Sequence, residues 1–139
     1  MEKVLVSEPI HQDAVRLLET HFQVIQGSDT GHLNQEAHEC AGILVRVARV
    51  DEAVMDALPK LRVIAKHGIG VDNIDVDAAT ARGIQVVNAP TANIHAVAEH
   101  TAALILALLK DVVVLDRATR SGKFDIRSNC LVKELRGKT

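Results

Sequence analysis

Short apolar runs alternate with amphipathic segments along the first part of this chain. Apolar runs of β type fall at residues 4–6, 24–25, 42–45, 61–65 and 84–87. Between them, residues 11–21 and 51–58 place apolar side chains at helical spacing, and residues 75–81 predict a short helix. Strands that are apolar on both faces and alternate with helices indicate a parallel sheet covered on both sides. We therefore expect an α/β fold with a flavodoxin-like, doubly wound parallel sheet.

Residues at the ends of these segments predict where the helices begin and end. Asp51 is a candidate N-cap, because its carboxylate can accept a hydrogen bond from an early backbone N–H, and Pro59 closes the helix. Either Asp75 or Asp77 caps the short helix that follows the fourth strand. Gly83 stands just beyond the end of that helix, where a left-handed backbone is common.

The pattern changes after Pro90. Residues 94–119 predict one long helix with Ala, Leu and Ile at many positions. Its apolar face is too broad to cover one side of a small sheet, so the helix is either buried between two bodies or paired with another copy. Residues 124–139 are polar, with weak β character at residues 130–132.

Composition narrows the class of protein. The chain has 139 residues, a formal net charge of −2, no Trp or Tyr and two Phe, so neither a nucleic acid nor an anionic membrane is an expected partner. Cys40 and Cys130 lie too far apart for a zinc ribbon or a Cys-x-x-Cys redox motif, and we expect two reduced thiols. The apolar stretch at residues 96–109 is too short and too polar to span a bilayer. With no signal peptide expected at the start, the prediction is a cytoplasmic protein.

The segment KHGIGVDNID, residues 66–75, holds the most informative motif. Gly68, Ile69 and Gly70 follow a predicted strand, as in the dinucleotide motif G-x-G-x-x-G, but the third glycine position is Asn73. Two glycines let backbone N–H groups approach a ligand closely, and successive N–H groups form an anion-binding nest. The alternative is a tight turn that only requires a positive φ.

Two basic residues also follow predicted strands. Arg46 ends the third strand and Lys66 ends the fourth. In open α/β sheets, ligands bind beyond the carboxyl ends of the strands, near the point where the strand order reverses. A guanidinium there can bind a carboxylate or phosphate through two hydrogen bonds, although a solvated arginine is the simpler interpretation.

The histidines do not form a metal site by spacing. His95 and Glu99 share one helix face, but His100 lies about 100° around the helix from Glu99. The spacing matches no metalloprotease motif, so we expect no metal. Four other histidines, His11, His21, His32 and His38, lie in or beside weakly patterned segments and are expected to be solvated.

Several motifs together resemble one family. The segments GILVRVARV, LRVIAKHGIGVDNIDVDAATARGIQVVNAPTANIHAVAEH and RSGKF…ELRGKT are similar to NAD-dependent D-2-hydroxyacid dehydrogenases of the D-3-phosphoglycerate dehydrogenase type. The resemblance covers nearly the whole chain. It implies a flavodoxin-like substrate-binding domain at residues 1–92. Residues 93–139 would then be a long interdomain helix and the start of a truncated NAD-binding domain, with the Rossmann domain absent.

The resemblance also implies roles for individual residues. It assigns substrate contacts to Arg46, Lys66, Gly68, Ile69, Gly70 and Asn93. The N–H groups of residues 68–70 would hold the carboxylate of a small 2-hydroxy or 2-keto acid, and the two basic side chains would hold the phosphate of a 3-phosphoglycerate-like substrate. Ile69 and Val97 would approach the nicotinamide end of NAD.

The chain departs from the family pattern in two ways. Val47 stands where a small hydroxyl residue often follows the arginine, and the catalytic Arg, acidic residue and His of the Rossmann domain have no counterpart here. We therefore expect no catalytic residue, no dehydrogenase activity and no bound NAD for this chain alone. We also expect a homodimer formed through the helix at residues 94–120. The alternative function is a stand-alone, non-catalytic module that binds an anion or regulates a partner.

Overall fold

The computed structural model describes residues 1–27, 30–31 and 33–138. His32 lies outside the described residues, as do residues 28, 29 and 139. The chain separates into two compact units, Met1–Ala92 and Asn93–Thr139.

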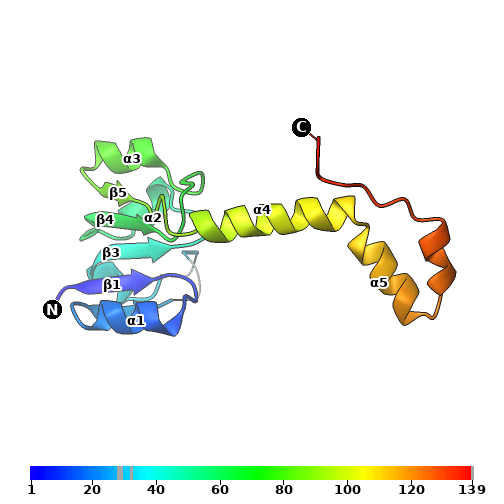
Figure 1. Ribbon diagram of the computed structural model, residues 1–139. Coiled ribbons are helices and arrows are strands. Elements are labelled where there is room, and N and C mark those ends of the chain that lie inside the picture. Colours follow the sequence, from blue (N-terminus) through cyan, green and yellow to red (C-terminus); the bar gives the residue numbers. More distant parts are fainter. Residues whose placement is uncertain (28–29, 32, 139) are drawn as a thin grey trace. The chain divides into compact units, whose positions relative to one another are not determined.

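The first unit is built on a five-stranded sheet (Figure 1). The strands are β1 (Lys3–Val6), β2 (Gln23–Gln26), β3 (Cys40–Val45), β4 (Val63–Lys66) and β5 (Gln85–Val87). All neighbouring pairs are parallel, and the order is β2-β1-β3-β4-β5. This is the flavodoxin-like order, so the predicted fold is confirmed, and the strand order reverses between β1 and β3.

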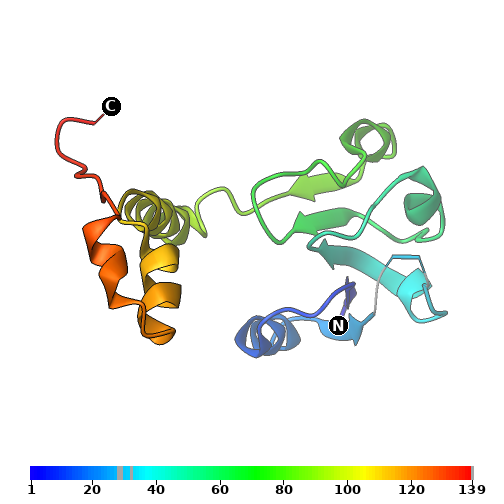
Figure 2. The ribbon, with the colours of Figure 1, turned by 90° about the vertical axis from the view of Figure 1, so that its right-hand side faces the viewer.

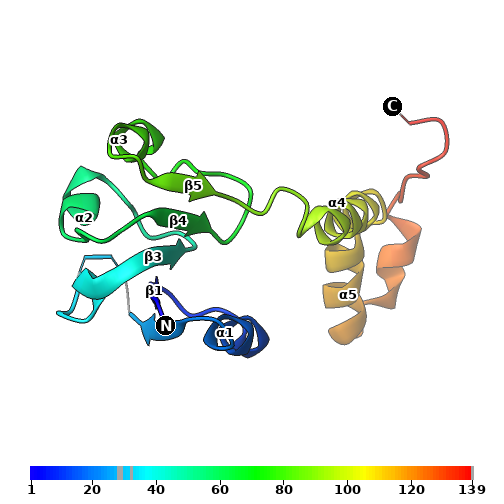
Figure 3. The ribbon, with the colours of Figure 1, turned by 90° about the vertical axis from the view of Figure 1, so that its left-hand side faces the viewer.

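Helices cover the sheet from both sides. Figures 2 and 3 show α1 (Gln12–Glu19) on one side and α2 (Glu52–Asp56) and α3 (Val76–Ala81) on the other. A single turn of 3₁₀ helix, η1 (Ala37–Glu39), leads into β3. The core combines apolar side chains of the strands with those of α2 and α3, including Leu5, Ile43, Val45, Met55, Leu58, Ile64, Ala78 and Ala79. The sheet and the two helices thus bury one shared apolar layer between them, as folded domains require.

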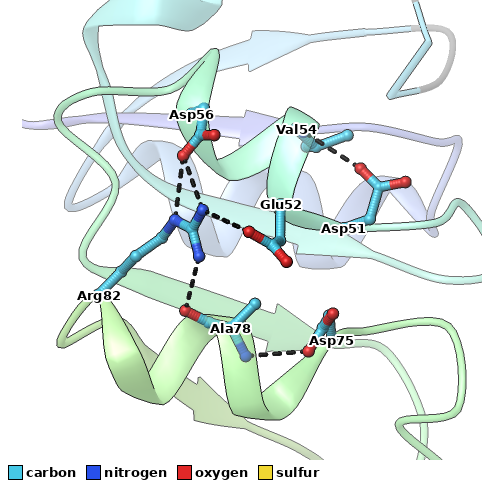
Figure 4. Close-up of polar contacts among 7 residues, drawn as sticks. All are labelled: Asp51, Glu52, Val54, Asp56, Asp75, Ala78 and Arg82. Carbon is cyan, nitrogen blue, oxygen red and sulfur yellow. Dashed lines mark hydrogen bonds and ion pairs between the residues drawn. The ribbon is translucent and has the colours of Figure 1, made fainter.

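The predicted helix caps are present (Figure 4). Asp51 Oδ1 accepts a hydrogen bond from the backbone N of Val54 at 3.2 Å, at the start of α2. Of the two candidates for the next cap, Asp75 is the one used: its Oδ1 accepts from Ala78 N at 2.9 Å. Gly83 has φ +69 just beyond the end of α3, in the left-handed region that glycine favours.

One arginine ties α2 to α3, as Figure 4 also shows. Arg82 donates from Nε to Asp56 Oδ1 and from Nη2 to Glu52 Oε2, both at 3.0 Å, and from Nη1 to the carbonyl of Ala78 at 3.2 Å. The hydrogen bonds that Arg82 donates to the carboxylates of Glu52 and Asp56 raise the pKa of Arg82 above its ordinary value. This cluster is structural, because it joins two helices and lies away from the carboxyl ends of the strands.

The second unit consists of α4 (Ile94–Leu109), α5 (Val112–Arg120) and η2 (Phe124–Ser128). The prediction of one continuous helix over residues 94–119 is wrong, because Asp111 has φ +48 and interrupts it. Asp tolerates the left-handed region better than most residues, and the three consecutive valines that follow have lower helix propensity than Ala or Leu. The apolar run therefore folds as two helices.

The weak β prediction at residues 130–132 is also wrong, since these residues form no strand. The backbone N of Cys130 donates to the carbonyl of Ile126 at 2.9 Å, and that of Lys133 donates to Leu109 at 2.8 Å. The segment therefore satisfies helix-end carbonyls instead of pairing with a strand. Both Cys40 and Cys130 are free thiols.

Far fewer residues are buried in the second unit than in the first. Among its described residues, 93–138, only Ala118 is buried. Large apolar side chains of α4 and α5 are exposed, among them Leu104, Ile105, Leu106, Leu108, Val112, Val113 and Val114. No helix within the described ranges is long and apolar enough to cross a membrane.

Candidate functional site

The carboxyl edge of the sheet gathers the polar residues that the sequence singled out. Glu8 comes after β1, Arg46 follows β3, Lys66 ends β4, and Asn88 follows β5. Because all strands are parallel, these four positions lie at one edge. The reversal of strand order falls between Glu8 and Arg46, where ligands bind in folds of this type.

The turn after β4 is fixed by its neighbour from β5. Gly68 has φ +143, and its N–H donates to the carbonyl of Lys66 at 3.0 Å. Its own carbonyl accepts from Ala89 N at 2.9 Å, and Asn88 Nδ2 donates to the carbonyl of Ile69 at 2.8 Å. The positive φ that the tight-turn interpretation required is therefore present at Gly68.

The next two N–H groups of this turn are available. Within residues 1–27, 30–31 and 33–138, the backbone N–H groups of Ile69 and Gly70 donate no hydrogen bond. Ile69 is 55% exposed, and Gly70 is exposed as well. A Cβ added at Gly70 would lie 3.0 Å from Asp72 Oδ2, so a larger residue there would push against that carboxylate. The turn therefore offers two adjacent donors on exposed residues.

The loop after β3 is held by a carboxylate from β1. Glu8 Oε2 accepts from the backbone N of Arg46 at 2.6 Å and of Ala48 at 3.1 Å, and Oε1 accepts from Val47 N at 3.0 Å. Burial raises the pKa of Glu8, but hydrogen bonds from these three N–H groups and from Ser7 Oγ more than offset this. Its pKa therefore lies below the ordinary 4.5, and the carboxylate is ionised at neutral pH.

Two side chains hold the same loop from its carbonyl side. Lys66 Nζ donates to the carbonyl of Arg46 and, at 2.5 Å, to Asn73 Oδ1. Asn73 Nδ2 in turn donates to the carbonyl of Ala48 at 2.6 Å. Asn73 occupies the third glycine position of the dinucleotide motif, and here its amide braces the loop.

The two basic residues differ in the donors they have left. Arg46 Nη1 donates to the carbonyl of Pro9 at 3.0 Å, which leaves most of its exposed guanidinium free to bind an anion. Lys66 is partly buried and already has two acceptors for its three ammonium protons. Arg46 is therefore the stronger candidate for an anion contact.

This turn does not fit the pyrophosphate of a dinucleotide. A dinucleotide loop leads directly into a helix whose N-terminus faces the phosphates. Here α3 begins only at Val76, and the carboxylate of Asp75 occupies its N-terminus. A negative charge at that position opposes phosphate binding, so the turn suits a small anion at its own N–H groups instead.

The last two predicted site residues, Asn93 and Val97, belong to the second unit. Asn93 is the N-cap residue of α4 without a side-chain capping bond, and Val97 is exposed on that helix. Among the described residues, no three His, Cys, Asp or Glu side chains converge as metal ligands would.

The sequence analysis did not single out Glu8. A carboxylate two residues beyond a central strand, at the reversal of strand order, is the signal that could have indicated it.

Comparison with known proteins identifies the family. The family model for the D-isomer specific 2-hydroxyacid dehydrogenase catalytic domain matches residues 4–136. The chain belongs to this family of oxidoreductases.

Similar proteins agree on the class of enzyme. Over 139 residues the chain is 42% identical to D-3-phosphoglycerate dehydrogenase of Mycobacterium leprae, and the match covers 98% of the chain and 26% of the relative. D-3-phosphoglycerate dehydrogenase of Archaeoglobus fulgidus is 41% identical, with 99% and 27% covered. The chain thus spans about a quarter of the length of these curated relatives.

Two solved structures share the fold closely. The glyoxylate/hydroxypyruvate reductase of Sinorhizobium meliloti, in complex with NADP and malonate, superimposes with a TM-score of 0.84 at 27% identity, covering 99% of this chain and 44% of that one. D-lactate dehydrogenase of Aquifex aeolicus, complexed with NAD and lactic acid, gives a TM-score of 0.84 at 27% identity, covering 95% and 41%.

Proposed function

We propose that residues 1–139 supply the substrate-binding part of an NAD-dependent D-2-hydroxyacid dehydrogenase. The observation that carries this proposal is the pair of unpartnered N–H groups at Ile69 and Gly70, at the carboxyl edge of the sheet. Two adjacent N–H donors suit the carboxylate that every 2-hydroxy and 2-keto acid carries. Gly68 contributes by its positive φ, which aims the two following N–H groups, while its own N–H is bound to Lys66.

The substrate we propose is phosphorylated and similar to 3-phosphoglycerate. Arg46 supports this, because its exposed guanidinium can make a bidentate contact with a phosphate. Lys66 adds positive charge, and its ammonium group keeps one proton that could be donated to the substrate. The relatives named D-3-phosphoglycerate dehydrogenase, at about 40% identity, support the same substrate class.

NAD is the cofactor we propose for the complete enzyme, where it accepts a hydride from the substrate. In this chain the exposed side chains of Ile69 and Val97 offer apolar contacts for its nicotinamide end, and the unused amide of Asn93 is a polar contact where the domains cross. Hydride transfer also needs a bound, oriented cofactor and a base for the hydroxyl proton. We assign no residue of this chain to either role and propose that residues 1–139 alone do not turn over substrate.

We also propose that the chain forms a homodimer through α4 and α5. Burying even ~500 Å² of their exposed apolar surface would be worth on the order of 12 kcal/mol before the cost of association. The exposed leucines and valines of both helices support this partner choice.

A titration followed by NMR tests the proposed site directly. D-3-phosphoglycerate added to the 139-residue chain should shift the amide resonances of Ile69 and Gly70. Arg46→Met should weaken its binding at least tenfold, about 1.4 kcal/mol, whereas Arg46→Lys should lose less because it keeps the charge. D-glycerate, which lacks the phosphate, should bind weakly and equally to both variants.

The outcomes separate the candidate functions. If the two amides do not move with any 2-hydroxy acid, the substrate-binding proposal fails. Tight binding with no gain on adding NAD and a separate Rossmann domain favours the stand-alone module instead. Formation of NADH by the purified chain would contradict the proposal that it is inactive alone.

A further inference from the structure

Glu8 makes a set of contacts that the substrate contacts proposed above do not use. Its carboxylate receives three successive backbone N–H groups, those of Arg46, Val47 and Ala48, across 38 to 40 residues of sequence. Successive N–H groups of this kind form a nest for an anion. Here the anion is a side chain of the same protein, placed where the strand order reverses.

The nest and the carbonyl contacts act on one short segment. Glu8 binds its N–H groups, while Lys66 and Asn73 bind the carbonyls of Arg46 and Ala48. The Arg46 side chain also returns to the β1 loop, since Nη1 donates to the carbonyl next to Glu8, that of Pro9. Both the backbone and the guanidinium of Arg46 are therefore set by Glu8 and Pro9, in the loop that follows β1.

We propose that Glu8 is a positioning residue for the anion contact of Arg46, acting through the N–H nest at residues 46–48. The proposal rests on the proposed function in one respect, because it takes Arg46 to be the group that meets the substrate phosphate. Glu8 does not touch the substrate. It fixes the loop from which the guanidinium projects, so that the guanidinium is oriented before an anion arrives.

An electrostatic role and a positioning role of Glu8 predict opposite effects on substrate binding. Glu8 is a carboxylate close to the site of an anionic substrate, so its charge alone repels the substrate. If it acted only through charge, Glu8→Gln would tighten the binding of D-3-phosphoglycerate. If it acts by position, the same change should weaken binding, because the Gln amide group presents N–H donors to a nest made of N–H donors.

The first experiment measures the nest without any ligand. Amide hydrogen exchange of Arg46, Val47 and Ala48 in the 139-residue chain should be at least tenfold faster in Glu8→Gln than in the native chain. Glu19→Gln is the matched control, because it removes the same charge from the exposed end of α1 and should leave these three amides unchanged. In Glu8→Ala, added formate should restore part of the protection by filling the nest.

The second experiment measures binding. D-3-phosphoglycerate should bind Glu8→Gln about tenfold more weakly than the native chain, and Glu19→Gln should bind as the native chain does. Tighter binding by Glu8→Gln, or unchanged exchange at residues 46–48, overturns the positioning role. A third outcome separates the two proposals. If exchange is faster in Glu8→Gln but the native chain binds no hydroxy acid, the Glu8 contacts with residues 46–48 are upheld and the proposed function is rejected.

Discussion

The two units of this chain use similar apolar residues to opposite effect. In Met1–Ala92, the apolar residues of the strands and of α2 and α3 share one buried layer. In Asn93–Thr139, α4 has a higher density of Ala, Leu and Ile than any strand, yet among the described residues of that unit only Ala118 is buried. An apolar segment becomes a core only when a second layer covers it.

The difference indicates what each unit needs. The sheet unit encloses its core within its own residues, so its stability should be intrinsic. The helical unit presents its apolar side chains as a surface. Large contiguous apolar surfaces on folded proteins are commonly binding surfaces. The following predictions test whether the two units differ in this way, from the largest expected effect to the smallest.

The same truncation in the two units should give the largest contrast. Leu58 is 1% exposed within the core, and Leu131 is 88% exposed in the second unit. Leu58→Ala should lower the free energy of unfolding by about 3 kcal/mol through lost burial and a residual cavity. Leu131→Ala should change it by less than about 0.5 kcal/mol. Chemical denaturation followed by circular dichroism measures both, and equal effects would remove the contrast between the units.

Charges placed on the helical surface should next disrupt self-association. The double change Leu104→Lys and Leu108→Lys puts two charges where we propose the dimer contact. The dissociation constant of the dimer should rise at least about 100-fold, or ~2.7 kcal/mol. The double change Leu131→Lys and Leu135→Lys is the control, since it adds the same two charges at exposed positions outside α4 and α5. Sedimentation velocity gives the result, and a native chain that is monomeric at every concentration would refute the dimer.

Two glycines with nearly the same backbone test whether the units unfold together. Gly83 has φ +69 and Gly122 has φ +73, and an added Cβ at either meets no atom within 4 Å. Alanine at each position therefore introduces backbone strain alone, about 1 kcal/mol. Gly83→Ala should lower the thermal midpoint of the sheet unit, whereas Gly122→Ala should not. If both lower one shared midpoint in calorimetry, the units are a single cooperative structure.

The smallest expected effect is a pH dependence from Glu8. Its folded-state pKa lies below the ordinary 4.5, so above that pH its stabilising contribution is fully present. As the pH falls through the lowered folded-state value, the carboxylate takes up a proton and the contribution is lost. The difference in unfolding free energy between the native chain and Glu8→Gln should therefore be constant near neutral pH and shrink in acid. A difference that grows in acid would show the opposite sign of pKa shift.

The sequence predicted the sheet well because its signals are local. Alternating apolar runs, the cap at Asp51 and the glycine at position 83 each act over a few residues, and the structure contains all three. The break at Asp111 was missed because the helical apolar pattern continues across it. A single residue in a left-handed conformation leaves no trace in that pattern.

The site was predictable only in part, for a physical reason. Glycines and basic residues at strand ends are visible along the chain, and Arg46, Lys66 and Gly68 do lie at the expected edge. The contacts of Glu8 and Asn73 join segments 25 to 40 residues apart, and they depend on the order of strands in the sheet. In the sequence, Asn73 only marks a departure from the dinucleotide motif. In the fold, its side-chain amide joins Lys66 to the carbonyl of Ala48.

The place of β1 in the sheet has a consequence for how the protein is made. β1 leaves the ribosome before β2 and β3, yet it lies between them in the sheet. Until residues 40–45 emerge, one side of β1 has no neighbour, and an unpaired strand edge invites association with other chains. During that interval Glu8 also lacks its amide partners. Closure of the Glu8 contacts should then report the moment at which a nascent chain has completed the centre of its sheet.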